Sequence, residues 1–223
     1  ADMTIDNYIK CGVNVEHIQK VQGSSGVAPI WVDSSGQNRF IVVSGANDKI
    51  DADKASSSLL QIPDLNVLIG QFEIPMEVTE KVFAVAKESG ISTILNPAPA
   101  KIPSESLLKL TDWFVPNEVE FSNITGTDAF NDANLISYSN TISSNLIVTL
   151  GESGAALVLE DSVTKISAPE VSAIDTTGAG DAFVGAFAYG IASGKSPQDA
   201  ISLGIQKASD SVTRTGTQSS YRA

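Results

Sequence analysis

Short apolar runs alternate along the chain with segments whose apolar residues recur at helical spacing. Three runs rich in β-branched residues, 67–70, 91–95 and 146–150, are typical of buried strands. Between the first two, residues 76–89 place apolar side chains on one helical face, and Gly90 ends the segment. Continuous apolar strands separated by amphipathic helices indicate parallel strands covered on both faces. The pattern predicts a three-layer α/β/α fold with a mostly parallel sheet.

The C-terminal half continues this alternation. Two apolar runs, 155–159 and 163–166, flank a polar turn and predict an antiparallel pair of strands. Two helices are expected to close the chain, at 182–193 and 197–212. The same patterns predict helices at 104–110, 118–125 and 129–139, and a strand at 113–115.

Residues near the start of the chain show a different pattern. Two β-rich runs, 27–32 and 38–43, flank the polar turn 33–36, which predicts a β-hairpin. Pro29 lacks a ladder donor, so its strand is expected to lie at an edge or to be bulged. We expect this hairpin to lie off the main sheet as a small β lid.

Composition narrows the classes of partner. The 14 Lys and Arg against 26 Asp and Glu residues give a formal net charge of -12, which repels nucleic acid and anionic lipid alike. We therefore expect no nucleic-acid partner and no membrane partner. Cys11 is the single cysteine, which fits a reducing cytoplasm. An anionic ligand would have to be held by local backbone donors and cations.

The segment Asp175–Asp181 (DTTGAGD) carries the strongest chemical signal, because it is glycine-rich and directly precedes a predicted helix. Such a turn lets backbone N–H groups converge, and the helix N-terminus adds positive potential. The spacing differs from a dinucleotide fingerprint, since Phe183 stands where a third glycine is required, and from a Walker loop. Asp181 is a candidate base for a hydroxyl group. The alternative is that Asp181 only caps a helix starting at Ala182.

The same segment resembles the signature of the ribokinase-like (PfkB) carbohydrate kinases. Five further segments resemble that family in the same order, namely QFEIP at 71–75, NPAP at 96–99, NEVE at 117–120, TLG at 149–151 and TRTGTQSS at 213–220. Of these segments, NPAP and the TQSS end of the last one look most like the ribokinase branch of the family. The resemblance implies an ATP-dependent sugar kinase that converts ribose to ribose 5-phosphate.

The resemblance also implies roles for individual residues. Asp181 would be the catalytic base, and the amides of Gly178, Ala179 and Gly180 would form the anion hole for the transferred phosphoryl group. Glu73, together with Asp181, would bind the sugar. The nucleotide would be bound by Asn117, Thr149, Gly151 and Gly180.

Two cations follow from the resemblance, Mg²⁺ and K⁺. Mg²⁺ would be organised by Glu120, for which helix capping together with Asn117 is the alternative. Glu73 has the alternative of a solvated side chain that precedes a helix. K⁺ would be held by Asp175, Thr177, Ser211, Arg214, Gly216 and Ser220. Ile205 departs from the Asn or His common at this position in the family, which weakens the expectation for adenine.

By resemblance, residues 1–20 and 47–223 form the nucleotide-binding core and residues 21–46 the lid strands, through which a homodimer would form. The family begins with a strand that carries an Asn-x-Asp sugar motif, followed by a Gly-Gly segment, and neither occurs here. We therefore expect that the N-terminal strands are absent and that this chain alone is inactive. Two alternatives remain: one half of a split kinase, or a non-catalytic nucleotide-binding or scaffold module of the same fold.

Overall fold

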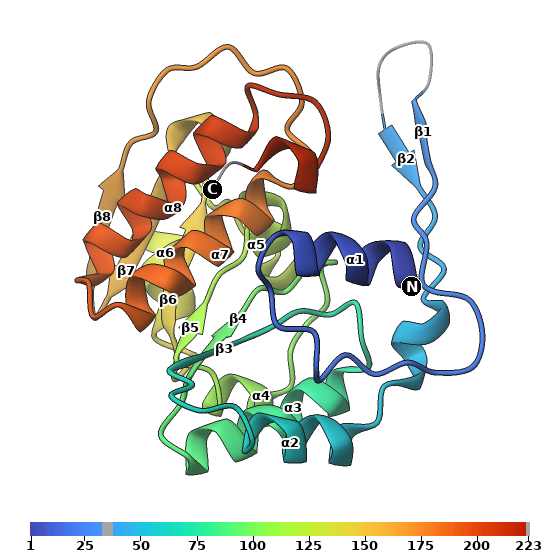
Figure 1. Cartoon of the computed structure of the whole chain (residues 1–223). Coiled ribbons are helices and arrows are strands. Elements are labelled where there is room, and N and C mark those ends of the chain that lie inside the picture. Colours follow the sequence, from blue (N-terminus) through green and yellow to red (C-terminus); the bar gives the residue numbers. More distant parts are fainter. Residues whose placement is uncertain (33–37, 222–223) are drawn as a thin grey trace.

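The computed structural model describes residues 1–32 and 38–221. A six-stranded sheet in the order β3-β4-β5-β6-β7-β8 forms its centre (Figure 1). The strands are β3 (Val67–Gly70), β4 (Ser92–Leu95), β5 (Trp113–Phe114), β6 (Asn145–Thr149), β7 (Ala155–Leu159) and β8 (Ser162–Ile166). Strands β3 to β6 pair in parallel, whereas β7 and β8 are antiparallel. The predicted α/β architecture is confirmed.

Eight α-helices surround the sheet in the described part of the chain (Figure 1). They are α1 (Asp2–Lys10), α2 (Ala52–Leu59), α3 (Met76–Glu88), α4 (Glu105–Lys109), α5 (Glu118–Thr125), α6 (Asp132–Ser139), α7 (Ala179–Ala192) and α8 (Pro197–Ser211). Short 3₁₀ turns lie at Gly45–Lys49, Gly151–Ser153 and Gln218–Ser220. The predicted helix at 129–139 is shorter at its start, because the Asn131 side chain caps α6 by accepting from the Ala133 N–H.

The sheet separates two buried clusters. Ile94 and Ile147 belong to a cluster with α7 and α8, whereas their neighbours Leu95 and Leu146 belong to a cluster with α5 and α6. Successive side chains of a strand point to opposite faces, so the two clusters lie on opposite sides of the sheet. This arrangement confirms the three layers.

The hairpin forms a separate two-stranded sheet from β1 (Ile30–Val32) and β2 (Asn38–Phe40). It projects from the body beside α1 (Figure 1), as expected for a hairpin off the main sheet. Both strands are shorter than the predicted runs, and an isolated bridge between Val27 and Val43 continues the ladder. The predicted turn 33–36 lies outside the described residues. Its function as a lid stays a prediction.

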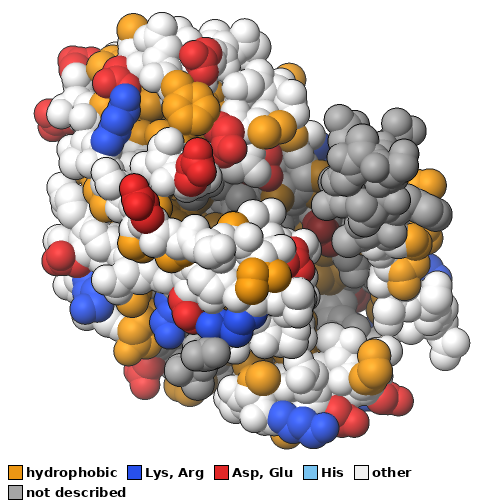
Figure 2. Space-filling view, turned by 90° about the horizontal axis from the view of Figure 1, so that it is seen from above, with side chains coloured by type: hydrophobic (Ala, Val, Ile, Leu, Met, Phe, Trp, Pro, Cys, Tyr) orange, Lys and Arg blue, Asp and Glu red, His pale blue; other side chains and the backbone are white. Residues whose placement is uncertain are grey.

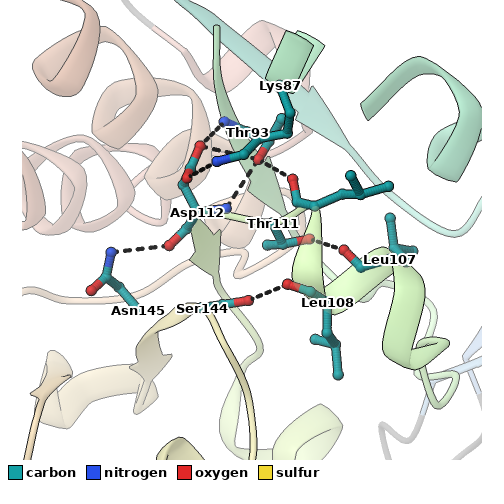
Figure 3. A network of polar contacts seen from close by, with 9 residues as sticks. Lys87, Thr93, Leu107, Leu108, Thr111, Asp112, Ser144 and Asn145 are labelled. Carbon is teal, nitrogen blue, oxygen red and sulfur yellow. Dashed lines mark hydrogen bonds and ion pairs between the residues drawn. The ribbon is translucent and has the colours of Figure 1, made fainter. Parts of the chain in front are cut away.

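Asp112 fixes the amino ends of the central strands (Figure 3). Its carboxylate accepts hydrogen bonds from the Thr93 N–H at 2.9 Å and from the Lys87 ammonium at 2.5 Å. Its backbone carbonyl accepts from the Asn145 N–H at 2.9 Å. These partners belong to α3, β4 and β6, so Asp112 joins three elements of the fold through hydrogen bonds.

The surface is acidic in keeping with the composition. Figure 2 shows Asp and Glu side chains spread over the face that is seen from above. Within the described residues, none of the helices combines the length and the apolar character that crossing a membrane requires.

Candidate functional site

Four neighbouring parallel strands each end next to a polar side chain. Gln71 follows β3, Asn96 follows β4, Asn117 lies three residues after β5, and Thr149 is the last residue of β6. A parallel bridge joins Asn117 to Thr149. Carboxyl ends of parallel strands meet at one edge of the sheet, which is where ligands bind in open α/β folds. The sheet topology alone therefore assembles a polar edge.

Helix α7 begins at this edge, three residues earlier than predicted. Gly178 is its N-cap with φ +80°, and a Cβ there would come within 2.5 Å of the Tyr221 hydroxyl. That hydroxyl donates to the Gly178 carbonyl at 2.8 Å, so the position requires glycine. Asp181 lies inside the first helical turn. The alternative in which Asp181 caps a helix starting at Ala182 is therefore wrong.

The strand ends and the start of α7 enclose a small cavity of about 140 Å³. Its lining residues are Asn96, Ala98, Val115, Asn117, Glu120, Thr149, Gly178, Gly180, Asp181 and Val184. Two of them, Glu120 and Asp181, are carboxylates, and no Lys or Arg is among the described lining residues. A Cβ added to Gly180 would meet no atom within 4 Å, so its backbone borders open space.

Asn117 and Glu120 form a capping box at the start of α5. The Asn117 side chain accepts from the Glu120 N–H at 2.7 Å, and the Glu120 carboxylate accepts from the Asn117 N–H at 2.8 Å. The capping interpretation is thus confirmed. Burial raises the pKa of Glu120 although the Asn117 N–H lowers it, and the charges of Glu118 and Asp181 raise it further. The box holds a carboxylate of raised pKa in the cavity wall.

The six residues expected to hold a monovalent cation lie in two hydrogen-bonded groups. In the first, the Asp175 carboxylate accepts from the Thr177 hydroxyl at 2.6 Å and from the Gly216 N–H at 2.9 Å. These bonds and the Thr177 N–H lower the pKa of Asp175 to about 2. In the second, the Arg214 Nε donates to the Ser220 carbonyl at 2.8 Å, and the Arg214 N–H donates to the Ser211 carbonyl at 3.2 Å.

Other predicted site residues lie away from the cavity wall. Glu73 is exposed between β3 and α3, and Gly151 has a φ of +55° at the start of a 3₁₀ turn. The Ala179 N–H donates to the Thr176 carbonyl at 3.2 Å. Ile205 is buried in the cluster under α8. Within residues 1–32 and 38–221 there is no group of three or more His, Cys, Asp or Glu side chains that could hold a metal.

Comparisons with known proteins place this geometry in a family. The profile of the pfkB family carbohydrate kinases matches residues 1–223. The chain belongs to this family. It is 35% identical over 227 residues to a deoxyribokinase of Salmonella typhi, covering 99% of this chain and 74% of that protein. As a member of the pfkB family, this chain is a phosphotransferase that acts on a carbohydrate.

Solved structures agree with the assignment to the pfkB family. The ribokinase of Thermotoga maritima superposes with a TM-score of 0.82 at 35% identity, covering 100% of this chain and 74% of that one. The ribokinase of Arabidopsis thaliana, solved with ribose and ATP, superposes with a TM-score of 0.83 at 28% identity, covering 95% and 70%.

The sequence assigned no role to three residues of the site in this pfkB chain, although Gln71 and Asn96 lie in the segments QFEIP and NPAP that resemble the family. Asn96 lines the cavity, Gln71 contacts Asp181, and Tyr221 holds the turn at Gly178. Asn96 and Gln71 each directly follow a strand, and a polar residue at that place is a signal that was available in the sequence. Tyr221 lies 43 positions from Gly178, and no local pattern predicts their contact.

Proposed function

We propose that the natural gene product that contains this chain transfers the γ-phosphoryl group of ATP to the 5-hydroxyl of ribose, with Asp181 as the general base. The observation that carries this proposal is the position of Asp181. It lies in the first turn of α7 and lines the same cavity as Gly178 and Gly180. A carboxylate there accepts the hydroxyl proton where helix-terminal amides stabilise the phosphoryl group.

The proposed reaction needs only one proton acceptor from the chain. Asp181 takes the proton of the sugar hydroxyl, the hydroxyl oxygen bonds to the γ-phosphorus, and the bond from that phosphorus to the ADP oxygen breaks. The amides of Gly178 and Gly180 stabilise the charge on the transferred group. The Ala179 amide, proposed as a third donor, contributes less because it donates to the Thr176 carbonyl.

On the nucleotide side we assign Asn117, Thr149 and Gly151 to the phosphates and ribose of ATP. We assign Mg²⁺ to Glu120, acting largely through water, because the cavity has two carboxylates and no Lys or Arg among its described lining residues. Burial raises the pKa of Glu120, so a cation would offset the cost of its charge. When bound, Mg²⁺ neutralises charge on the phosphates.

We further assign K⁺ to the loops that contain Asp175, Thr177, Ser211, Arg214, Gly216 and Ser220. The ionised Asp175 supplies negative charge there, since hydrogen bonds hold its pKa at about 2. The Ser220 carbonyl is a weaker ligand than expected, because the Arg214 guanidinium already donates to it. Replacing K⁺ by choline in the kinase assay should lower turnover, and equal rates in the two salts would remove this assignment.

Two relatives with the same identity to this chain differ in the sugar that their names give. A deoxyribokinase and a ribokinase are both 35% identical to this chain, so 2-deoxyribose is the second candidate. Both sugars present the same 5-hydroxyl to Asp181. We assign Glu73, which follows β3 at the carboxyl edge of the sheet, to the sugar hydroxyls.

A sugar panel tests the function. The natural gene product that contains these 223 residues is assayed with MgATP and ribose, 2-deoxyribose, fructose or adenosine, and coupled ADP release is measured. Ribose should give the highest kcat/KM. A preference for fructose or adenosine contradicts the ribokinase assignment, and nucleotide binding without turnover of any sugar would indicate the non-catalytic module.

The hairpin is assigned to a homodimer. Val27, Ile41, Val42 and Val43 expose between 46% and 59% of their surface on it, which is costly in a monomer. Sedimentation of the gene product should give a dimer that Val42→Glu dissociates. A monomeric wild-type protein contradicts the assignment.

A further inference from the structure

Asp181 has a hydrogen-bond partner that directly follows strand β3. The Gln71 Nε2 atom donates one hydrogen bond to Asp181 Oδ1 at 3.2 Å and a second to Asn96 Oδ1 at 3.0 Å. The two amide residues are neighbours because β3 and β4 pair in parallel, with Gly70 opposite Leu95, and each residue directly follows its strand. The link between the sheet and Asp181 is therefore built by the strand register.

The orientation of both amides is fixed from the core outward. Asn96 is 8% exposed, and its Nδ2 donates to the Val115 carbonyl at 2.9 Å, so Asn96 Oδ1 must face Gln71. Gln71 must then present its NH₂ group rather than its oxygen. Both Nε2 protons are used, one on Asn96 and one on Asp181, and a flipped Gln71 amide would place three oxygens together.

We propose that Gln71 is a positioning residue that orients the Asp181 carboxylate for proton transfer. This inference rests on the proposed function, in which Asp181 is the base. By holding Oδ1, Gln71 leaves Oδ2 as the oxygen that receives the proton of the sugar hydroxyl. The chain from Val115 through Asn96 and Gln71 then ties the reactive carboxylate to the rigid end of the sheet.

The test is a double-mutant cycle in the natural gene product. Gln71→Met keeps the length of the side chain but removes both hydrogen bonds, and it should lower kcat roughly tenfold while the KM for ATP changes less than about twofold. In the Asp181→Asn background the same substitution should lower kcat by less than about twofold, because the residue that Gln71 orients is no longer a base. Gln61→Met is the matched control and should match wild type, because Gln61 is an exposed residue that follows α2.

Gln71→Glu separates positioning from filling of space. It is isosteric, but it places a carboxylate oxygen against Asn96 Oδ1 and Asp181 Oδ1, so its kcat should be lower than that of Gln71→Met. Wild-type kcat in either Gln71 variant, or an equal loss in the Asp181→Asn background, overturns the inference. Wild-type kcat in Asp181→Asn alone overturns the proposed function instead. Thermal unfolding of each variant shows which of them are folded.

Discussion

Carboxylate side chains lie at both ends of the parallel strands, but their surroundings differ. At the amino end, Asp112 is surrounded by donors from Thr93 and Lys87, and these contacts join neighbouring elements (Figure 3). At the carboxyl end, Asp181 and Glu120 line a cavity without a Lys or Arg among its described lining residues. The first carboxylate is paired within the fold, whereas the other two are gathered with like charge.

This difference separates stability from function within one sheet. A carboxylate that accepts hydrogen bonds from a strand amide and a lysine stabilises the folded chain. Two carboxylates in one small cavity cost stability, and such an arrangement is typical of a site that binds cations or moves protons. The physical chemistry of the side chains therefore marks the carboxyl edge independently of the family match.

The largest effect should come from the carboxyl end. Asp181→Asn keeps the size of the side chain but removes the proton acceptor, so we expect kcat of the natural gene product to fall at least about 10²-fold. Nucleotide affinity should stay within a few-fold, as measured by calorimetry. Asp199→Asn is the matched control, since Asp199 occupies the first turn of α8, and it should keep wild-type turnover. Near wild-type turnover in Asp181→Asn removes the catalytic role.

A substitution at the amino end of the strands should change the stability of the protein but not its activity. Asp112→Ala deprives the buried Thr93 N–H of its acceptor and should lower the free energy of unfolding by about 1–3 kcal/mol, with kcat and KM unchanged. Denaturant titration measures the loss. Asp53→Ala removes an exposed pair with Lys81 and should cost less than about 1 kcal/mol. A large loss of turnover in Asp112→Ala at full folding would remove the distinction between the two ends.

Much of the fold could be predicted because the spacing of apolar residues reflects which face of a helix or strand is buried. The runs at 67–70 and 155–159 coincide with β3 and β7, and residues 118–125 coincide with α5. Helix α2 was missed because its Ala-Asp-Lys-Ala-Ser-Ser-Ser sequence has few apolar residues. The start of α7 was predicted three residues late, because Gly178 and Gly180 are poor helix formers. The hydrogen bond from Tyr221 to the Gly178 carbonyl, which lies at the true start, is not a local sequence signal.

For the site, the local pattern identified Asp181 and the glycines before it but not what faces them. The DTTGAGD segment is continuous, so its position at a helix N-terminus follows from neighbouring residues. The contact between Gln71 and Asp181 spans 110 positions and depends on how α7 packs on the sheet. For Glu120, the capping alternative followed from its spacing to Asn117 and is confirmed, whereas its burial depends on the packing of the folded chain.

The smallest expected effect is the loss of stability caused by the negative charge of the buried Glu120. Because burial raises its pKa above the ordinary value of 4.5, the folded chain holds this proton more tightly than the unfolded chain does. Stability is therefore lost as pH rises from about 4.5 through the folded-state pKa, and it is regained as pH falls. Glu120→Gln can keep the capping box and carries no charge, so at pH 7 without Mg²⁺ its Tm should be higher than wild type by about 1–3 °C.

The stability difference between Glu120→Gln and wild type should depend on pH. The advantage of Glu120→Gln should shrink as pH falls and vanish below about pH 4.5, where wild-type Glu120 is protonated as well. Thermal unfolding followed by circular dichroism between pH 4 and pH 7 in EDTA measures it. Glu105→Gln is the matched control, because Glu105 is an exposed first-turn residue of α4 and its replacement should give no gain. A gain independent of pH would show that like charge in the cavity does not limit stability at the carboxyl end.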